Sequence, residues 1–170
     1  MVDFNGSMEG TSIKKAVECL EFFVRSLPLH SYYNIIRFRN DYEKLFEESV
    51  ECNEETVQKG LTIISNIDAD LGGTQLVPPL SDLFKQNCKY GQRQIFIITD
   101  GEVWNVSTLL ELVSKNRKEN RCFTIGIGRG RDACLVEWIA RVSNGKCCFV
   151  QEGDSISEKV IPQLESSLLP

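Results

Sequence analysis

Apolar residues recur at every third or fourth position in several stretches of the chain, a spacing that places them on one face of an α-helix. The first stretch runs from Ile13 to Leu27 and is followed by Pro28. The same spacing continues in further sets: Val57, Leu61 and Ile64; Leu80, Leu83 and Phe84; Val106, Leu109, Leu110 and Val113; Leu135, Trp138, Ile139 and Val142; and a tail from about Val160 through Leu168. Each set predicts one helix.

Residues near the ends of these stretches predict where the helices begin. Thr11 or Ser12 can cap the first helix and Asn53 the second, because their side-chain oxygens accept hydrogen bonds from the free N–H groups of a first turn. A proline inside a helix removes a hydrogen bond and clashes with the preceding turn. We therefore expect Pro78-Pro79 in or before the first turn of the third helix, and we expect Pro162 to delay or kink the last one.

Runs rich in β-branched and aromatic residues separate the helices and predict strands. Tyr32–Phe38 and Tyr42–Phe46, joined by a turn at Asn40-Asp41, predict a hairpin at the edge of a sheet. Arg93–Asp100 has a continuous apolar centre, which is typical of a central strand covered on both faces. Two more strands are expected, at Cys122–Ile127 and Lys146–Val150.

The alternation of strands and helices predicts an α/β fold, with a doubly wound, mostly parallel sheet, one antiparallel edge strand and helices on both faces. The 170 residues have the length of one domain, so we expect residues 1–170 to form a single unit. Met1-Val2-Asp3 stands where the first strand of such a sheet is expected and is too short to make one. We therefore expect the chain to begin inside its first strand, as part of a longer chain.

Composition and charge narrow the function classes. Lys and Arg number 19 and Asp and Glu 24, a net charge of −5 without blocks of one sign, so no nucleic-acid partner is expected. The longest apolar runs have four residues, whereas a membrane span needs about 20, so no membrane insertion is expected. Seven cysteines without a Cys-x-x-Cys pair and a single histidine argue against zinc and against a disulfide framework. With no signal peptide at the start, these features predict a reducing, cytoplasmic location.

Polar side chains gather in the predicted loops at the carboxyl ends of the strands. Asp3 and Asp100 each end a strand, and Asn5, Ser7 and Thr74 lie in loops at the same edge of the sheet. In a doubly wound sheet, ligands bind at this edge, where the strand order reverses. Oxygen ligands without thiol or imidazole favour a hard cation such as Mg²⁺. The same residue types also make ordinary turns and helix caps, which is the alternative to a metal site.

Three segments resemble the metal-site loops of a von Willebrand factor type A (vWA) domain: Asp3-Phe4-Asn5-Gly6-Ser7-Met8, Gly72-Gly73-Thr74 and Thr99-Asp100-Gly101-Glu102. The order of predicted helices and strands is similar to that family across essentially the whole chain. Leu71–Thr74, Phe96–Val103 and Ile125–Gly128 are most similar to the branch in which the domain follows a VIT domain. That branch includes inter-α-trypsin inhibitor heavy chains, the vault poly(ADP-ribose) polymerase and intracellular relatives without an enzyme domain, and the chain most resembles the last group.

The resemblance implies a metal-ion-dependent adhesion site, with Asp-x-Ser-x-Ser in the first loop, Thr in the second and Asp in the third. Asp3, Ser7, Thr74 and Asp100 match this pattern. Asn5 departs from it, because the family has a metal-binding Ser there and the carbonyl of an amide reaches about one bond further than a hydroxyl, which Mg²⁺ tolerates poorly. As a loop residue, Asn5 is expected to be exposed.

In the family, an acidic side chain of a partner protein completes the coordination of the ion. The implied function is therefore non-catalytic binding of a protein partner with an exposed acidic side chain, through Mg²⁺ or Mn²⁺. The implied metal residues are Asp3, Asn5, Ser7, Thr74 and Asp100, in a site that Asn5 weakens or empties.

Two alternative functions stay open from the sequence. The first is a metal-free docking domain of a longer VIT-containing protein. The second is a Mg²⁺-dependent phosphohydrolase with Asp3 as nucleophile; Asn5 then stands where such enzymes have the general acid, and an amide cannot donate a proton in that way. Trp104, just after the third loop, is either an exposed aromatic anchor at the partner face or a packed loop residue.

Overall fold

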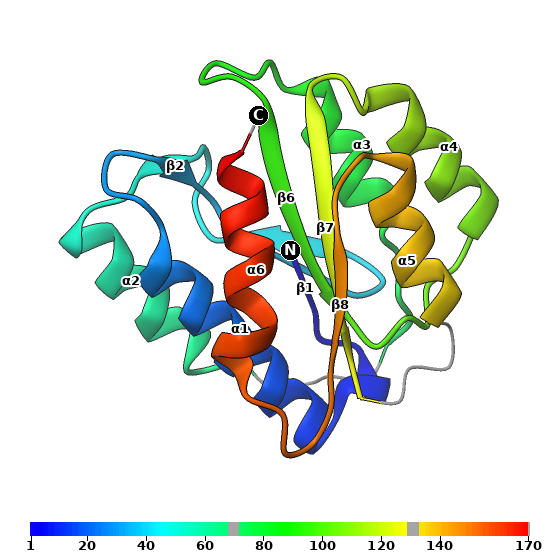
Figure 1. Cartoon of the computed structure of the whole chain (residues 1–170), viewed down its shortest axis with the longest axis horizontal. Coiled ribbons are helices and arrows are strands. Elements are labelled where there is room, and N and C mark those ends of the chain that lie inside the picture. The colour runs from blue at the N-terminus through cyan, green and yellow to red at the C-terminus, as the bar shows by residue number, and fades with distance from the viewer. Residues whose placement is uncertain (68–71, 129–132, 170) are drawn as a thin grey trace.

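A mostly parallel sheet forms the centre of the protein (Figure 1). The computed structural model describes residues 1–67, 72–128 and 133–169, and within them six strands have the order β4-β3-β1-β6-β7-β8. The parallel strands are β1 (Val2–Asp3), β3 (Ile36–Phe38), β6 (Arg93–Thr99), β7 (Asn120–Ile127) and β8 (Cys147–Val150). β4 (Tyr42–Lys44) is antiparallel to β3 and forms one edge. The predicted fold class is confirmed, and the strand order reverses between β1 and β6.

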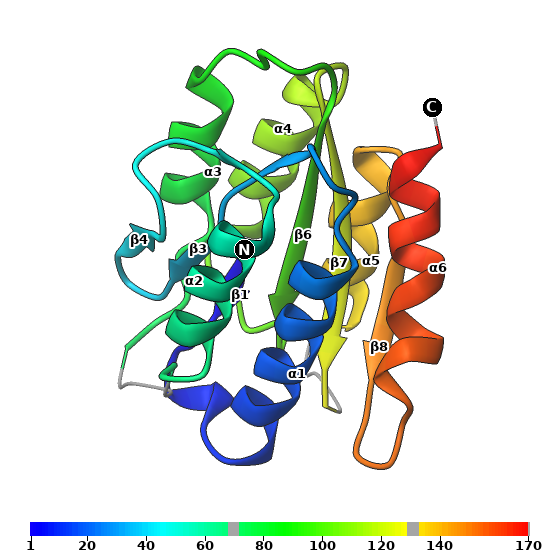
Figure 2. The ribbon, with the colours of Figure 1, turned by 90° about the vertical axis from the view of Figure 1, so that its left-hand side faces the viewer.

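Helices cover both faces of this sheet (Figures 1 and 2). One face carries α1 (Thr11–Ser26), α2 (Glu54–Ile64) and α6 (Ile156–Leu168), and the other carries α3 (Val77–Lys85), α4 (Val106–Asn116) and α5 (Ala133–Val142). β6 contributes to both cores, since Ile98 packs into the first and Ile95 and Ile97 into the second. Side chains of a strand point alternately to opposite faces. The apolar run of β6 therefore belongs to a central strand buried on both sides, as predicted.

Two helix starts follow the predicted local chemistry. Asn53 caps α2, because its Oδ1 accepts a hydrogen bond from Thr56 N at 3.0 Å while Asn53 N donates to Thr56 Oγ1 at 3.1 Å. Pro78 and Pro79 lie in the first turn of α3, where backbone N–H groups have no partner inside the helix and a proline costs no hydrogen bond.

Two other helix starts differ from the predictions. Gly10, with φ 83°, is the N-cap of α1 in place of Thr11 or Ser12. The left-handed backbone that glycine tolerates turns the chain into the helix, so Thr11 already has helical geometry. α6 begins at Ile156, earlier than expected, and contains Pro162. This proline is exposed, so water can satisfy the carbonyl that its missing N–H leaves free.

The predicted strand Tyr32–Phe38 is wrong as a single element. It is split into β2 (Tyr32–Tyr33) and β3 around Asn34. The Asn34 side chain accepts hydrogen bonds from Ile35 N at 2.8 Å and Phe46 N at 3.1 Å, and it donates to Phe46 O at 2.8 Å. These bonds replace strand pairing at this point. β2 therefore leaves the main sheet and pairs with β5 (Val50–Glu51).

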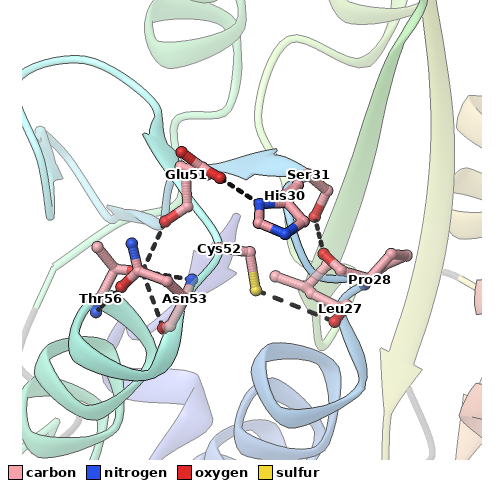
Figure 3. A network of polar contacts seen from close by, with 8 residues as sticks. All are labelled: Leu27, Pro28, His30, Ser31, Glu51, Cys52, Asn53 and Thr56. Atoms are coloured by element: carbon pink, nitrogen blue, oxygen red, sulfur yellow. Dashed lines mark hydrogen bonds and ion pairs between the residues drawn. The ribbon is translucent and has the colours of Figure 1, made fainter.

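The small sheet of β2 and β5 joins the end of α1 to the start of α2 (Figure 3). Cys52 N donates to Ser31 O at 2.7 Å, and His30 Nδ1 lies 2.5 Å from Glu51 Oε1. Thr56 Oγ1 of α2 donates to Glu51 O at 2.7 Å. The single histidine of the sequence is thus paired with a carboxylate in the loop that follows α1, at the opposite end of that helix from Asp3 and Ser7.

β1 is short but central. Val2 pairs with Arg37 of β3 and Ile98 of β6, and Asp3 pairs with Phe38 of β3. The Met1 amino group donates to Phe96 O at 2.6 Å, and burial lowers its pKa to about 5. The expectation that further residues precede β1 stays a prediction. Among the described helices, none is both long and apolar enough to cross a bilayer.

Candidate metal centre

The predicted site residues come from three segments that meet at the carboxyl ends of β1 and β6 (Figure 2). Asp3 ends β1, and Asn5 and Ser7 follow it at the short 3₁₀ helix η1 (Gly6–Met8). Asp100 directly follows β6, and Thr74 precedes α3. Because β1 and β6 are neighbouring parallel strands, these segments lie side by side. The contacts described next connect all of the predicted residues.

Asp3 forms the buried floor of the site. Its Oδ2 accepts a hydrogen bond from Thr99 Oγ1 at 2.7 Å, and its Oδ1 accepts one from Asn5 N at 3.2 Å. Burial raises the pKa of Asp3 to about 7; hydrogen bonds from Thr99 and Asn5 oppose this rise, and the charge of Asp100 adds to it. A nearby cation would favour the charged carboxylate. The sequence reasoning missed Thr99 as a site residue, and its only signal was its place directly before Asp100.

Asn5 connects two of the three segments. Its Oδ1 accepts a hydrogen bond from Ser7 N at 2.7 Å and contacts Ser7 Oγ, and its Nδ2 contacts Thr74 Oγ1. A backbone N–H needs an acceptor, so the bond from Ser7 N fixes the amide with its oxygen toward Ser7 and its nitrogen toward Thr74. The expectation of an exposed Asn5 is wrong, because the residue is only 2% exposed. Both ends of the buried amide need polar partners, and both have them.

Ser7 and Asp100 form the outer part of the site. Ser7 Oγ contacts Asp100 Oδ2, and Asp100 Oδ1 accepts a hydrogen bond from Glu102 N at 3.1 Å. Ser7 is exposed and Asp100 is half-buried, whereas Asp3, Asn5 and Thr74 are buried. The site therefore has a closed floor and an accessible rim.

Thr74 is held in place by backbone hydrogen bonds around it. Trp104 N donates to Thr74 O at 3.2 Å, and Gly73 N donates to Asn40 Oδ1 at 2.8 Å. Asn40, which the sequence predicts only as a turn residue, thus anchors the second segment. Residues 70 and 71 of that loop lie outside the described residues.

The donor atoms of this cluster fit a small hard cation. Asp3 and Asp100 supply carboxylate oxygens, and Ser7 and Thr74 supply hydroxyl oxygens. In the described part of the chain, no three side chains among His, Cys, Asp and Glu gather around a point where a metal ion could sit. The cluster combines two carboxylates with hydroxyls, a set that suits Mg²⁺, which keeps several waters, better than zinc, which prefers thiolate and imidazole ligands. The Asn5 amide nitrogen, whose lone pair is delocalised into the carbonyl, faces Thr74, and metal binding by the Asn5 oxygen stays a prediction.

Fold and site together define an α/β domain with an oxygen-lined cluster at the switch point of a doubly wound sheet. The family model of the von Willebrand factor type A domain matches residues 1–149. The chain belongs to this family, as the motifs predict.

Longer proteins carry similar domains. Von Willebrand factor A domain-containing protein 5A of Rattus norvegicus is 38% identical over 157 residues, which are 92% of this chain and 19% of that protein. A von Willebrand factor A domain-containing protein of Dictyostelium discoideum is 37% identical over 171 residues, 100% of this chain and 18% of that protein. The chain therefore spans about a fifth of the length of these relatives.

Solved structures share the fold at low sequence identity. A von Willebrand factor type A protein from Catenulispora acidiphila has a TM-score of 0.80 at 14% identity, covering 92% of this chain and 39% of that chain. Manganese-loaded TRAP protein of Plasmodium vivax has a TM-score of 0.70 at 18% identity, covering 92% and 68%. Mussel proximal thread matrix protein 1 with a zinc-occupied metal-ion-dependent adhesion site (MIDAS) motif has a TM-score of 0.69 at 16% identity, covering 97% of this chain and 46% of that chain.

Proposed function

We propose that this domain is a non-catalytic protein-interaction module that binds an acidic side chain of a partner protein through Mg²⁺ or Mn²⁺. Asp3, Ser7, Thr74 and Asp100 would hold the ion. The observation that carries the proposal is the contact network that joins these oxygens to one another through Asn5 at the carboxyl ends of β1 and β6. A bound ion would supply positive charge at a site whose side chains are otherwise acidic.

The charges of the site explain why a cation would decide the choice of partner. Asp3 and Asp100 both point into the cluster, and the whole chain carries a net charge of −5. Without an ion, an approaching carboxylate meets like charge. With an ion neutralising the cluster, the accessible rim formed by Ser7 and Asp100 can receive that carboxylate. Two neighbours of the same fold carry manganese and a zinc-occupied MIDAS motif, which supports a metal in this cluster.

The chemistry of the buried residues favours binding over catalysis. A phosphohydrolase of the aspartyl-phosphate type needs a proton donor close to its nucleophile. Asn5 occupies that place, and its amide is engaged with Ser7 and Thr74. Asp3, the corresponding nucleophile, is fully buried under these groups. A substrate phosphate would therefore have to displace the Asn5 contacts before it reached Asp3.

A metal-free docking domain is the second candidate, and Asn5 is the observation that favours it. Its amide links the first and second segments through hydrogen-bonding contacts alone. The surface could then keep its shape without an ion. In both cases we infer a module of a longer protein, because the similar relatives are about five times as long as this chain. A VIT domain in that protein is proposed from the sequence resemblance alone, and a cytoplasmic location from the cysteine and histidine content.

Calorimetric titration of Mg²⁺ and Mn²⁺ separates the two candidates. We expect saturable heat with the wild-type domain and none with Asp100→Ala, which removes an accessible ligand at the rim. Asp82→Ala is the matched control, because Asp82 lies on α3 and pairs with Lys44. Equal heats in the wild type and Asp100→Ala, or no heat in the wild type at millimolar metal, would overturn the metal-dependent function and leave the metal-free one.

A further inference from the structure

Trp104 is a large aromatic residue that lies on the surface directly beside the candidate metal centre. Its side chain is 57% exposed. Its backbone N donates to Thr74 O, and its ring lies over Gly73, where an added Cβ would come within 2.9 Å of indole atoms Cζ2 and Cη2. The indole therefore rests on the segment that carries Thr74. The structure thus shows the exposure of Trp104, and its role as an anchor for a partner stays a prediction.

The backbone on either side fixes this position. Val103 is buried in the core beneath α3 and α4, and its N donates to Gly101 O at 2.9 Å. Asn105 has φ 59°, a left-handed conformation that asparagine tolerates better than most residues, and α4 begins directly after it. Trp104 thus lies between a buried residue and a tight turn, so the exposed ring is attached to a rigid support.

The indole also has an unused hydrogen-bond donor. Within the ranges that the structure describes, Trp104 Nε1 has no acceptor. Tryptophan combines a large apolar area with one polar N–H, and this combination makes it common among the residues that dominate binding energy at protein interfaces. Here both parts are available to a partner, next to a site proposed to bind an acidic side chain.

We infer that Trp104 and Gly73 form a second contact surface, which selects partners that carry an apolar or proline residue close in sequence to the acidic residue. This inference rests on the proposed function. The apolar side chain would cover the indole, and a main-chain carbonyl of the partner would accept from Nε1. Glycine at position 73 matters because an added Cβ would lie 2.7 Å from Asn40 Oδ1 and 2.9 Å from the indole, so a side chain there would have to displace one or both.

The charges around the ring favour a protein segment over a membrane surface. Asp100 places a carboxylate at the exposed part of the cluster, and the chain is acidic overall. The acidic domain would repel an anionic lipid surface, because that surface presents many negative charges. One bound ion is enough to attract a single acidic side chain. Binding would therefore have two separable parts: a metal-dependent contact to the acid and a metal-independent contact of its neighbour with Trp104.

Selection of phage-displayed random peptides on the immobilised domain in Mg²⁺ tests this inference. On the wild type we expect enriched peptides with Asp or Glu next to an apolar residue or proline. On Trp104→Ala we expect enrichment of the acidic residue without the neighbour. Trp138→Ala is the matched control, because Trp138 is also exposed, at 45%, but lies on α5. Circular dichroism confirms that each variant is folded.

Affinities of one selected peptide make the test quantitative. We expect at least tenfold weaker binding to Trp104→Ala, which is about 1.4 kcal/mol, with unchanged Mg²⁺ affinity, and an intermediate loss for Trp104→Phe, which keeps a ring but not the N–H. In Trp138→Phe, Trp104 is the only tryptophan left, and its fluorescence should shift to shorter wavelength when the peptide covers it.

The outcomes separate this inference from the proposed function. Acidic peptides without a neighbour preference, or equal peptide affinity for the wild type and Trp104→Ala, would overturn the role of Trp104 and leave the metal-dependent function intact. Apolar peptides without an acidic residue, bound equally in EDTA and lost in Trp104→Ala, would refute the proposed function and with it the two-part recognition. Binding of the wild type to phosphatidylserine vesicles through Trp104, without peptide selection, would also overturn the inference.

Discussion

Replacing Asn5 by serine separates the two things that this side chain can do, which are to bind an ion and to connect the segments of the site. In the wild type, Asn5 accepts a hydrogen bond from Ser7 N at 2.7 Å, and its Nδ2 contacts Thr74 Oγ1. A serine hydroxyl can still accept from the backbone of Ser7, but it is too short to reach Thr74. Asn5→Ser therefore loses one buried contact and gains a hydroxyl of the kind that the family uses as a ligand.

The magnitudes follow from these contacts. The lost contact to Thr74 is worth about 1 kcal/mol, the net contribution of a typical hydrogen bond. A competent extra ligand could tighten Mg²⁺ binding about tenfold, or about 1.4 kcal/mol. Asn5→Ala loses the Thr74 contact and, unlike Asn5→Ser, also the acceptor for Ser7 N, so its cost should be about 2 kcal/mol or more.

Two measurements check this reasoning. In EDTA, urea unfolding should give the order wild type, Asn5→Ser, Asn5→Ala from most to least stable. Calorimetry should give the tightest Mg²⁺ binding for Asn5→Ser. If Asn5→Ser is as stable as the wild type without metal, the amide is not a structural link. If it binds Mg²⁺ no more tightly than the wild type, Asn5 is not what weakens the site.

Three further predictions concern pH, packing and cysteine reactivity. Because folding raises the pKa of Asp3 to about 7, the folded domain keeps this proton while the unfolded chain loses it near pH 4. The metal-free domain should therefore lose stability from this group as the pH rises from 4 to 7. Asp3→Asn should remove this pH-dependent component of the free energy of unfolding measured in urea. Gly73→Ala should crowd both Asn40 and Trp104, lower stability by about 1–3 kcal/mol and change the Trp104 fluorescence; an unchanged spectrum and melting curve would contradict the close packing of the ring on residue 73. Burial raises the pKa of Cys122 to about 12, whereas Cys134 is exposed, so iodoacetamide at pH 8 should modify Cys134 first by mass spectrometry, and rapid native modification of Cys122 would contradict its burial.

Local patterns predicted most of the fold because they act over a few residues. The apolar run of β6 identified a strand buried on both faces, and Asn53 identified the start of α2. The split of Tyr32–Phe38 could not be predicted in this way. It depends on Asn34 bonding to Phe46, a residue twelve positions away that only the folded chain brings near.

The candidate site likewise combines features that the sequence predicts with features that depend on contacts between distant segments. Placing Asp3 and Asp100 at the ends of neighbouring strands needed only the strand order, and the structure brings them to one cluster. The direction of the Asn5 amide depends on which backbone N–H and which hydroxyl surround it after folding. The support of the second segment by Asn40 is equally a tertiary contact, since Asn40 bonds to Gly73 across 33 positions of the sequence.

The most direct test of the central claim is the anomalous scattering of a crystal of this domain soaked in Mn²⁺. We predict one anomalous peak at the carboxyl ends of β1 and β6, within ligand distance of oxygens from Asp3, Ser7, Thr74 and Asp100, with the Asn5 oxygen still bonded to Ser7 N. The peak should be absent in crystals of Asp100→Ala. No peak at this position in the wild type at saturating Mn²⁺ would contradict the claim that the cluster is a metal centre.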